Sequence, residues 1–139
     1  MPSKAHRMLV DLIARKMRDD GYLPVAYDGR NLVLEGEIIH IPPRVGRHRP
    51  DVIGINPSTR SLCIGEAKTS DDLRSKRTQE QFLDYSKIMG RSSGQIADLI
   101  IGVTKDAEPS LTQILAELGL SNSPNVKYIV LPEELVDDE

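Results

Sequence analysis

Cysteine and large aromatic side chains are scarce in this chain of 139 residues, which has one cysteine, one phenylalanine and no tryptophan. A single cysteine excludes an internal disulfide and any zinc or iron–sulfur site built from four cysteines. Four tyrosines and one phenylalanine are too few for a broad platform on which bases could stack. If the protein binds a nucleic acid, its contacts should favour the phosphate backbone.

Long apolar segments are also missing from the sequence. No apolar run approaches the roughly 20 residues of a membrane-spanning helix, and residues 1–14 are charged and lack the apolar region of a signal peptide. These absences predict a cytoplasmic protein. Because 139 residues are enough for one hydrophobic core and too few for two, we expect a single domain over residues 1–139.

Two common catalytic motifs do not occur. The sequence contains no GxxxxGK phosphate-binding loop and no HExxH pair. Nucleotide hydrolysis of the phosphate-loop type and zinc proteolysis therefore lack their usual local signals.

Charge is unevenly distributed along the chain, although the net charge is only −3. Residues 40–91 carry ten basic and six acidic side chains, whereas residues 92–139 carry two basic and nine acidic ones. The positive stretch could neutralise DNA phosphates and make binding sensitive to salt, or it could be ordinary solvated surface. The residues predicted to contact DNA are Arg44, Arg47, His48, Arg49, Arg74, Lys76 and Arg77.

Two predicted strands carry one acidic side chain each, at ends that a hairpin brings together. Residues 51–56 and 61–68 are rich in apolar residues, and turn-forming residues lie between them. If the hairpin turns after Asn56, alternation places Asp51 opposite Glu66 on a face that is otherwise apolar. Two ionised carboxylates beside a core repel each other, so one must take a proton or a cation must lie between them.

A bound metal ion resolves this conflict, and the oxygen ligands favour Mg²⁺, with Mn²⁺ as a possible substitute. Such an ion suits hydrolysis of phosphodiester bonds, because it lowers the pKa of a bound water and stabilises charge on the leaving oxygen. Lys68 lies two residues after Glu66 and is expected on the same face. Its ammonium group could orient the attacking water or neutralise developing negative charge.

The remaining segments predict an α/β fold. A helix is expected over residues 4–19, with Ser3 as its cap and Gly21 as its stop. A second long helix should begin at Asp71 and Asp72 and end at Gly90, and a short one should run from Pro109 to just before Gly119. Further strands are predicted over residues 31–41, 97–103 and 126–131, giving the element order αβββαβαβ.

The segments Pro50-Asp51 and Glu66-Ala67-Lys68 resemble the signature of the PD-(D/E)xK nuclease superfamily. Residues 81–85, with Gln81 and Tyr85 four positions apart, are similar to the QxxxY motif of RecB-type members. The resemblance implies a restriction-endonuclease-like core, a central mixed sheet flanked by helices in the order αβββαβαβ. It also implies that Gln81 and Tyr85 help to organise the catalytic site, either through DNA or through the lysine.

Further metal ligands are suggested only by the resemblance. The carbonyl of Ala67 would add a ligand as in the family, and His6 is the candidate for the upstream histidine of RecB-type nucleases. A histidine at the edge of the core is the plainer interpretation of His6. The first predicted helix contains no glutamate, so the third metal ligand stays open.

The first hypothesis is therefore a magnesium-dependent deoxyribonuclease that acts on branched or processed DNA, in repair or recombination, like Holliday junction resolvases or RecB. The second is a catalytically inactive nuclease fold that binds nucleic acid or assembles with partners. The third is a structural domain in which Asp51 and Glu66 are separated and solvated. Whether the enzyme cuts internally or from an end, whether it accepts RNA, and whether it forms a homodimer with paired sites are left open.

Overall fold

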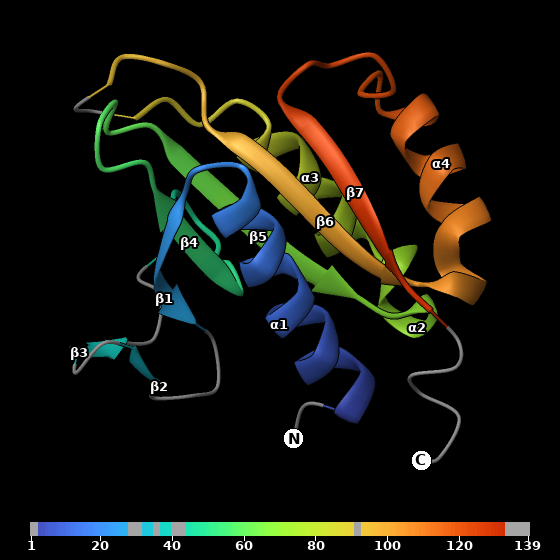
Figure 1. Ribbon diagram of the computed structural model, residues 1–139. Coiled ribbons are helices and arrows are strands. Elements are labelled where there is room, and N and C mark those ends of the chain that lie inside the picture. Colours follow the sequence, from blue (N-terminus) through green and yellow to red (C-terminus); the bar gives the residue numbers. More distant parts are fainter. Residues whose placement is uncertain (1–2, 28–31, 35–36, 40–43, 91–92, 133–139) are drawn as a thin grey trace.

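The computed structural model describes residues 3–27, 32–34, 37–39, 44–90 and 93–132. They form an α/β fold around a five-stranded mixed sheet with helices on both faces (Figure 1). The elements are α1 (Lys4–Asp19), β1 (Leu23–Tyr27), β2 (Leu32–Leu34), β3 (Glu37–Ile39), β4 (Val52–Ile55), β5 (Leu62–Lys68), α2 (Ser70–Leu73), α3 (Lys76–Tyr85), β6 (Asp98–Thr104), a short 3₁₀ turn (Lys105–Ala107), α4 (Glu108–Glu117) and β7 (Val126–Leu131).

The main sheet has the strand order β1-β4-β5-β6-β7. Strand β4 pairs antiparallel with β1 on one side and with β5 on the other. Strand β6 pairs parallel with β5 and with β7. Each parallel step is made by a helical crossover, as parallel pairing requires: α2 and α3 join β5 to β6, and α4 joins β6 to β7. Helix α1 covers one face of the sheet, and α3 and α4 lie on the other (Figure 1).

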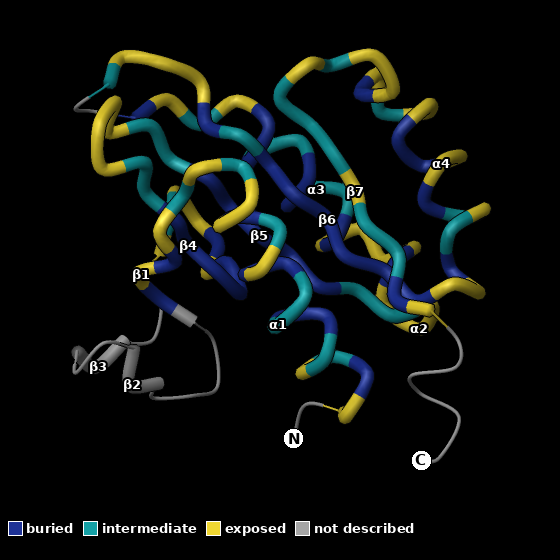
Figure 2. The backbone as a smooth tube through the Cα atoms, viewed as in Figure 1, coloured by how far each residue is buried: buried dark blue, intermediate teal, exposed yellow. Residues whose placement is uncertain are grey.

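Two apolar layers result from the alternation of side chains along the strands. On β5, Ile64 belongs to the cluster that packs against α3 and α4, while Cys63 and Ala67 belong to the cluster under α1. Figure 2 shows β5 and β6 as the buried centre of the molecule. The strand face of Ile64 is also the face of Glu66, so the proposed site lies on the α3 side of the sheet.

The β4–β5 hairpin has the predicted register. Ile53 pairs with Ile64 and Ile55 with Leu62, and the N–H of Asn56 donates to the carbonyl oxygen of Ser61 at 2.9 Å. The side chain of Asn56 accepts bonds from the next turn residues, Ser58 and Thr59. The alternating apolar pattern and the asparagine turn together set which residues meet across this pair.

Helix α1 begins and ends where the sequence predicted, and it packs very closely on the sheet. Ser3 caps its first turn by accepting the N–H of His6, and Gly21 follows with φ of 92°. A Cβ atom at Gly65 would lie 2.5 Å from Cγ2 of Ile13, and one at Gly102 would lie 2.9 Å from Cδ1 of the same side chain. Ile13 therefore sits in a socket made by two glycines on neighbouring strands.

Gly65→Ala is expected to lower the free energy of unfolding by about 1–3 kcal/mol, because the added methyl overpacks this socket. The new carbon would also lie 2.9 Å from Cε of Met17, so both Ile13 and Met17 would have to move to make room for it. Urea unfolding of the two proteins measures the effect. Ile13→Ala vacates the space, so in the double variant the cost of Gly65→Ala should shrink; strict additivity of the two costs would contradict the packing argument.

The first strand of the sheet differs from its predicted position. A strand was predicted over residues 31–41, but the sheet uses β1, and β2 and β3 pair with each other in a separate two-stranded sheet. Residues 31, 35–36 and 40–41 of the predicted strand lie outside the described residues. Proline is disfavoured inside a sheet, but Pro24 is tolerated because β1 is an edge strand whose register shifts between Pro24 and Ala26.

The predicted long helix after the hairpin is also interrupted. It divides into α2 and α3, and Ser75 caps the second of these by accepting the N–H of Thr78. The side chain of Thr78 also donates to the carbonyl of Asp72, which ties the two helices together. The acidic residues at positions 71 and 72 do start a helix, but it ends at Leu73.

Candidate functional site

Asp51 and Glu66 meet at the point where β4 begins and β5 leaves its antiparallel partner. The backbone N–H of Asp51 donates at 3.1 Å to the carbonyl oxygen of Gly65, the residue that pairs with Val52 at the end of the β4–β5 ladder. The two carboxyl groups come within hydrogen-bonding reach of each other, and both residues are buried, with 6% and 3% of their surface exposed. They are neither separated nor solvated, which removes the third hypothesis in the form stated above.

The pair shares its charge unequally. Burial, followed by the negative charge of Asp51, raises the pKa of Glu66 well above its usual range. Burial acts in the same direction on Asp51, but hydrogen bonds from His6 and from the N–H of Ala67 outweigh it and hold the pKa of Asp51 below its usual range. Without a cation, ionisation of the pair is therefore favoured at Asp51 and disfavoured at Glu66.

Asp51 is held in place by two donors. The backbone N–H of Ala67 lies 2.8 Å from Oδ2 of Asp51, and Nε2 of His6 lies 3.4 Å from the same oxygen. His6 projects from the first turn of α1, so the helix closes the site from the side opposite α3. Its position beside Asp51 fits either a structural partner of the aspartate or a metal ligand.

The carbonyl of Ala67 faces the same edge as its N–H, because both backbone groups of a strand residue point to one side. Along that edge β5 pairs with β4 as far as Gly65, which is opposite Val52. Beyond Gly65, the N–H of Ala67 donates to the side chain of Asp51 instead of to a strand. The Ala67 carbonyl is therefore placed at the site's edge of β5, as the resemblance implies. Within the described ranges, however, no group of three or more histidine, cysteine, aspartate or glutamate side chains is arranged to hold a metal ion.

Gln81 and Tyr85 lie one turn apart on α3, and both are buried. Burial and then the charges of Glu66 and Asp51 raise the pKa of Tyr85, which places its hydroxyl near the carboxylate pair. Among the described residues, four buried side-chain oxygens have no hydrogen-bond partner, and three of them are Oε2 of Glu66, Oε1 of Gln81 and the Tyr85 hydroxyl. Such atoms are costly to bury, and those of Glu66 and Tyr85 lie near each other, where a polar ligand could satisfy them.

Lys68 lies on the same face as Glu66 and is mostly buried. Its Nζ atom is 3.7 Å from Oε1 of Glu66, and 12% of its side chain is exposed. An ammonium group so close to a carboxyl favours the ionised form of that group, although burial outweighs it here. The structure thus brings Asp51, Glu66 and Lys68 together, and it places Tyr85, which the resemblance also implied, near the pair.

The residues predicted to bind DNA fall into two groups. His48 is only 6% exposed and its Nε2 lies 2.8 Å from Asp84, so its ring does not face solvent as a phosphate-binding residue should. Nε of Arg47 also bonds to Asp84, at 2.8 Å, and a second nitrogen of Arg47 lies 3.6 Å from Glu80. Asp84 and Glu80 were not predicted as site residues, because no local pattern links them to residues more than 30 positions away.

The other predicted DNA contacts are exposed: Arg44, Arg49, Arg74, Lys76 and Arg77. Arg44 donates to the carbonyl of Arg47, and Arg74 donates to the side chain of Gln113. The charge of Arg77 partly offsets the rise in the pKa of Tyr85, so its electrostatic influence reaches the site.

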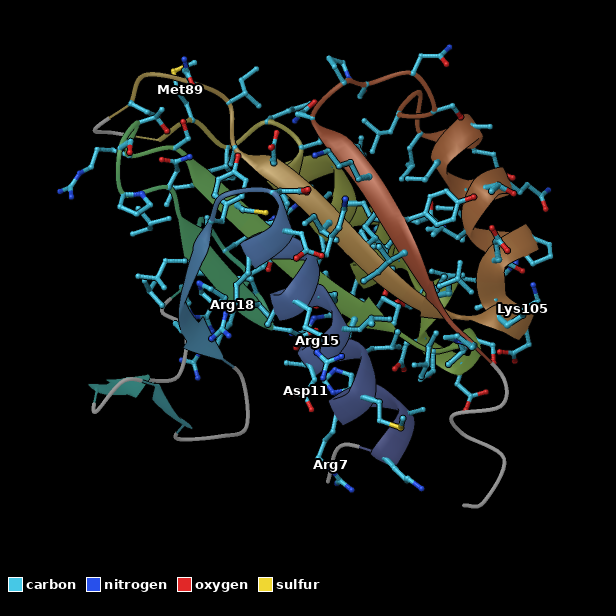
Figure 3. The ribbon with its side chains drawn as sticks, viewed as in Figure 1. Arg7, Asp11, Arg15, Arg18, Met89 and Lys105 are labelled. Carbon is cyan, nitrogen blue, oxygen red and sulfur yellow. The ribbon has the colours of Figure 1, made fainter. Side chains whose placement is uncertain are left out.

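Helix α1 carries a second basic surface, which the summed charges of the sequence segments did not reveal. Arg7, Arg15 and Arg18 are exposed along its outer face, with Asp11 between them (Figure 3). A hollow of about 240 Å³ lies on this side of the helix and is lined by Met8, Asp11, Leu12, Arg15 and Leu131. None of the residues of the carboxylate site lines it, so the hollow is separate from the proposed chemistry.

The chain matches no family model, and no solved structure is significantly similar to it. In the part of the chain that the structure describes, no helix has the length and apolar character needed to cross a membrane. The assignment of function therefore depends on the geometry of the site.

Proposed function

We propose that the protein is a magnesium-dependent deoxyribonuclease that hydrolyses phosphodiester bonds, with Mn²⁺ as an alternative ion. One observation carries the proposal: two buried carboxyl groups meet where β4 begins beside β5, and Oε2 of Glu66 has no hydrogen-bond partner among the described residues, while burial and the charge of Asp51 raise the pKa of Glu66. A cation between them would favour the ionised form of Glu66 and use the unpartnered oxygen. The donor set of oxygens thus fits a hard divalent ion.

Asp51, Glu66 and the carbonyl of Ala67 would hold the ion, and His6 is a candidate for a further ligand. When bound, the ion would supply an activated water and stabilise negative charge at the scissile phosphate. Lys68, whose Nζ lies beside Glu66, would neutralise charge that develops on the phosphate or orient the water. Asp51 stays ionised through the N–H of Ala67 and needs no rearrangement to accept a cation.

The element order supports a restriction-endonuclease-like core. Taken without β2, β3 and the short α2, the chain runs α1, β1, β4, β5, α3, β6, α4, β7, which is the order αβββαβαβ. Glu66 lies on the central strand β5 and Asp51 directly precedes the neighbouring strand β4, while the glutamine and tyrosine of α3 lie on the same side of the sheet as Glu66. We propose DNA as the substrate because the exposed basic residues Arg77 and Lys76 begin α3, beside the site.

A non-catalytic module that binds nucleic acid is the second candidate. It is favoured by one specific observation, namely that the described residues offer no third acidic or histidine ligand in metal-binding geometry. With two carboxylates alone, Mg²⁺ would depend on waters and substrate phosphates for its remaining ligands. The two candidates differ in cleavage rather than in DNA binding.

The wild-type protein should cleave DNA in Mg²⁺ or Mn²⁺ and stop when a chelator is added. Linear, single-stranded, supercoiled and four-way-junction DNA, tested separately, would identify the preferred substrate. Lys68→Met is expected to reduce the cleavage rate about 100- to 1,000-fold, because it removes one charge-stabilising group. It should leave Mn²⁺ binding, measured by electron paramagnetic resonance, intact.

DNA binding without cleavage in any of these metals would favour the non-catalytic module. Cleavage by Lys68→Met at the wild-type rate would show that the lysine has been assigned the wrong role. Arg60→Met is the matched control, since it removes an exposed basic side chain from the turn at the opposite end of the β4–β5 hairpin from the carboxylate pair.

A further inference from the structure

A tight turn anchors the segment that leads into β4. The backbone groups of Val45 and His48 pair with each other, at 2.7 and 3.3 Å, and close a turn over Gly46 and Arg47. Gly46 takes the positive φ of 64° that the turn requires. Three residues beyond His48, the chain reaches Asp51.

This turn is fastened to α3 through one carboxylate. Asp84 accepts from Nε of Arg47 and from Nε2 of His48, each at 2.8 Å. The hydrogen bond from Arg47 lowers the pKa of Asp84, so the group is ionised and can only accept. His48 must therefore carry its proton on Nε2 in this contact.

The histidine bond should matter more than the arginine bond. Arg47 has 63% of its side chain exposed, and exposed ion pairs contribute little. His48 has 6% exposed, so the loss of its partner would leave a buried N–H without an acceptor. The ring of His48 also meets the ring of Tyr85 edge-on, with centroids 5.7 Å apart.

We infer that His48 and Asp84 are positioning residues that hold the segment delivering Asp51 against the helix delivering Tyr85. Asp84 precedes Tyr85 directly in α3, so a single contact pair sets the relation between both elements of the site. The inference builds on the proposed nuclease function and replaces the expectation that His48 contacts DNA. Among the described residues, the side-chain hydrogen bonds and ring contacts of His48 and Asp84 are with each other, with Arg47 and with Tyr85, and not with Asp51 or Glu66.

The test compares His48→Gln, Asp84→Asn and the double variant in steady-state cleavage. Each single change should lower kcat about 10- to 100-fold, the loss typical of groups that orient metal ligands, while KM for DNA stays unchanged. Because the residues act as a pair, the double variant should lose no more than either single variant. Asp84→Ala should be slower than Asp84→Asn, which keeps one acceptor oxygen for His48.

Asp20→Asn is the matched control, since Asp20 links Lys16 to Lys127 at the far end of α1 from His6. It should leave kcat at the wild-type value. Far-ultraviolet circular dichroism at the assay temperature confirms that every variant is folded, so that lost activity is not lost structure.

Three results would overturn the inference: wild-type kcat in both single variants, losses that multiply in the double variant, or a rise in KM with a salt dependence of DNA binding about one unit shallower. The last result would restore His48 as a phosphate contact. An inactive wild-type protein would reject the nuclease proposal itself, and so the two failures are distinguishable.

Discussion

Asp51→Asn is expected to reduce magnesium-dependent cleavage by at least about 1,000-fold, more than the loss typical of a group that only orients a ligand. The carboxylate is the one permanently charged member of the pair, because the N–H of Ala67 and the imidazole of His6 keep it ionised. An asparagine has the same shape and no charge, so the attraction for a cation disappears. Single-turnover cleavage with saturating DNA measures the chemical step directly.

Asp98→Asn provides the control for this loss. Asp98 is a partly buried aspartate that accepts from the Tyr22 hydroxyl at 2.7 Å, and it pairs with Cys63, three positions before Glu66 on β5. Three residues along a strand correspond to about 10 Å. The control should cleave at the wild-type rate, whereas equal losses in both variants would indicate a general effect of removing a buried acid.

Glu66→Gln is expected to stabilise the metal-free protein at pH 8 while it removes metal binding. The pKa of Glu66 is raised in the folded state, so folding retains a proton that the unfolded chain releases above pH 4.5. That contribution is fully present at low pH and is lost as the pH rises toward the folded pKa, at up to about 1.4 kcal/mol per pH unit. Glutamine keeps a donor for Asp51 and has no proton to lose.

The pH dependence of stability in chelator tests this expectation. Between pH 5 and pH 8 the free energy of unfolding of the wild type should fall relative to that of Glu66→Gln, by at most about 1.4 kcal/mol per pH unit. Asp51 acts in the opposite sense and at lower pH, since its lowered pKa stabilises the fold above about pH 4 and ceases to do so in acid. Saturating Mg²⁺ should stabilise the wild type alone. Parallel pH profiles for the two proteins would contradict a raised pKa at Glu66.

The hairpin that carries the acidic pair was predictable because its signals are local. Alternation places Ile53 and Ile64 on one face, and a shift of one residue would have moved both out of the core. Asn56 supplied the turn that sets the register. Given that register, the meeting of Asp51 with Glu66 follows from the geometry of the strands.

The elements that were misplaced depend on context that a single stretch of sequence does not contain. The strand with Pro24 is acceptable only because it lies at an edge of the sheet, which is decided by the order of all five strands. Ser75, in contrast, is a recognisable helix cap, and weighing it would have predicted the break between α2 and α3. The partner of His48 is 36 positions away, so nothing near the histidine indicated that its ring is buried.

The glycine socket under α1 has a consequence for the site at the other end of that helix. Ile13 is locked over Gly65 and Gly102, and His6 lies two turns, or about 10 Å, further toward the N-terminus. The packing of Ile13 therefore fixes the position of α1 on the sheet, and with it the position of His6 beside Asp51. Substitutions that change the packing of Ile13 on Gly65 and Gly102 could therefore shift the His6 imidazole relative to Asp51. No residue proposed to bind metal or phosphate would need to change.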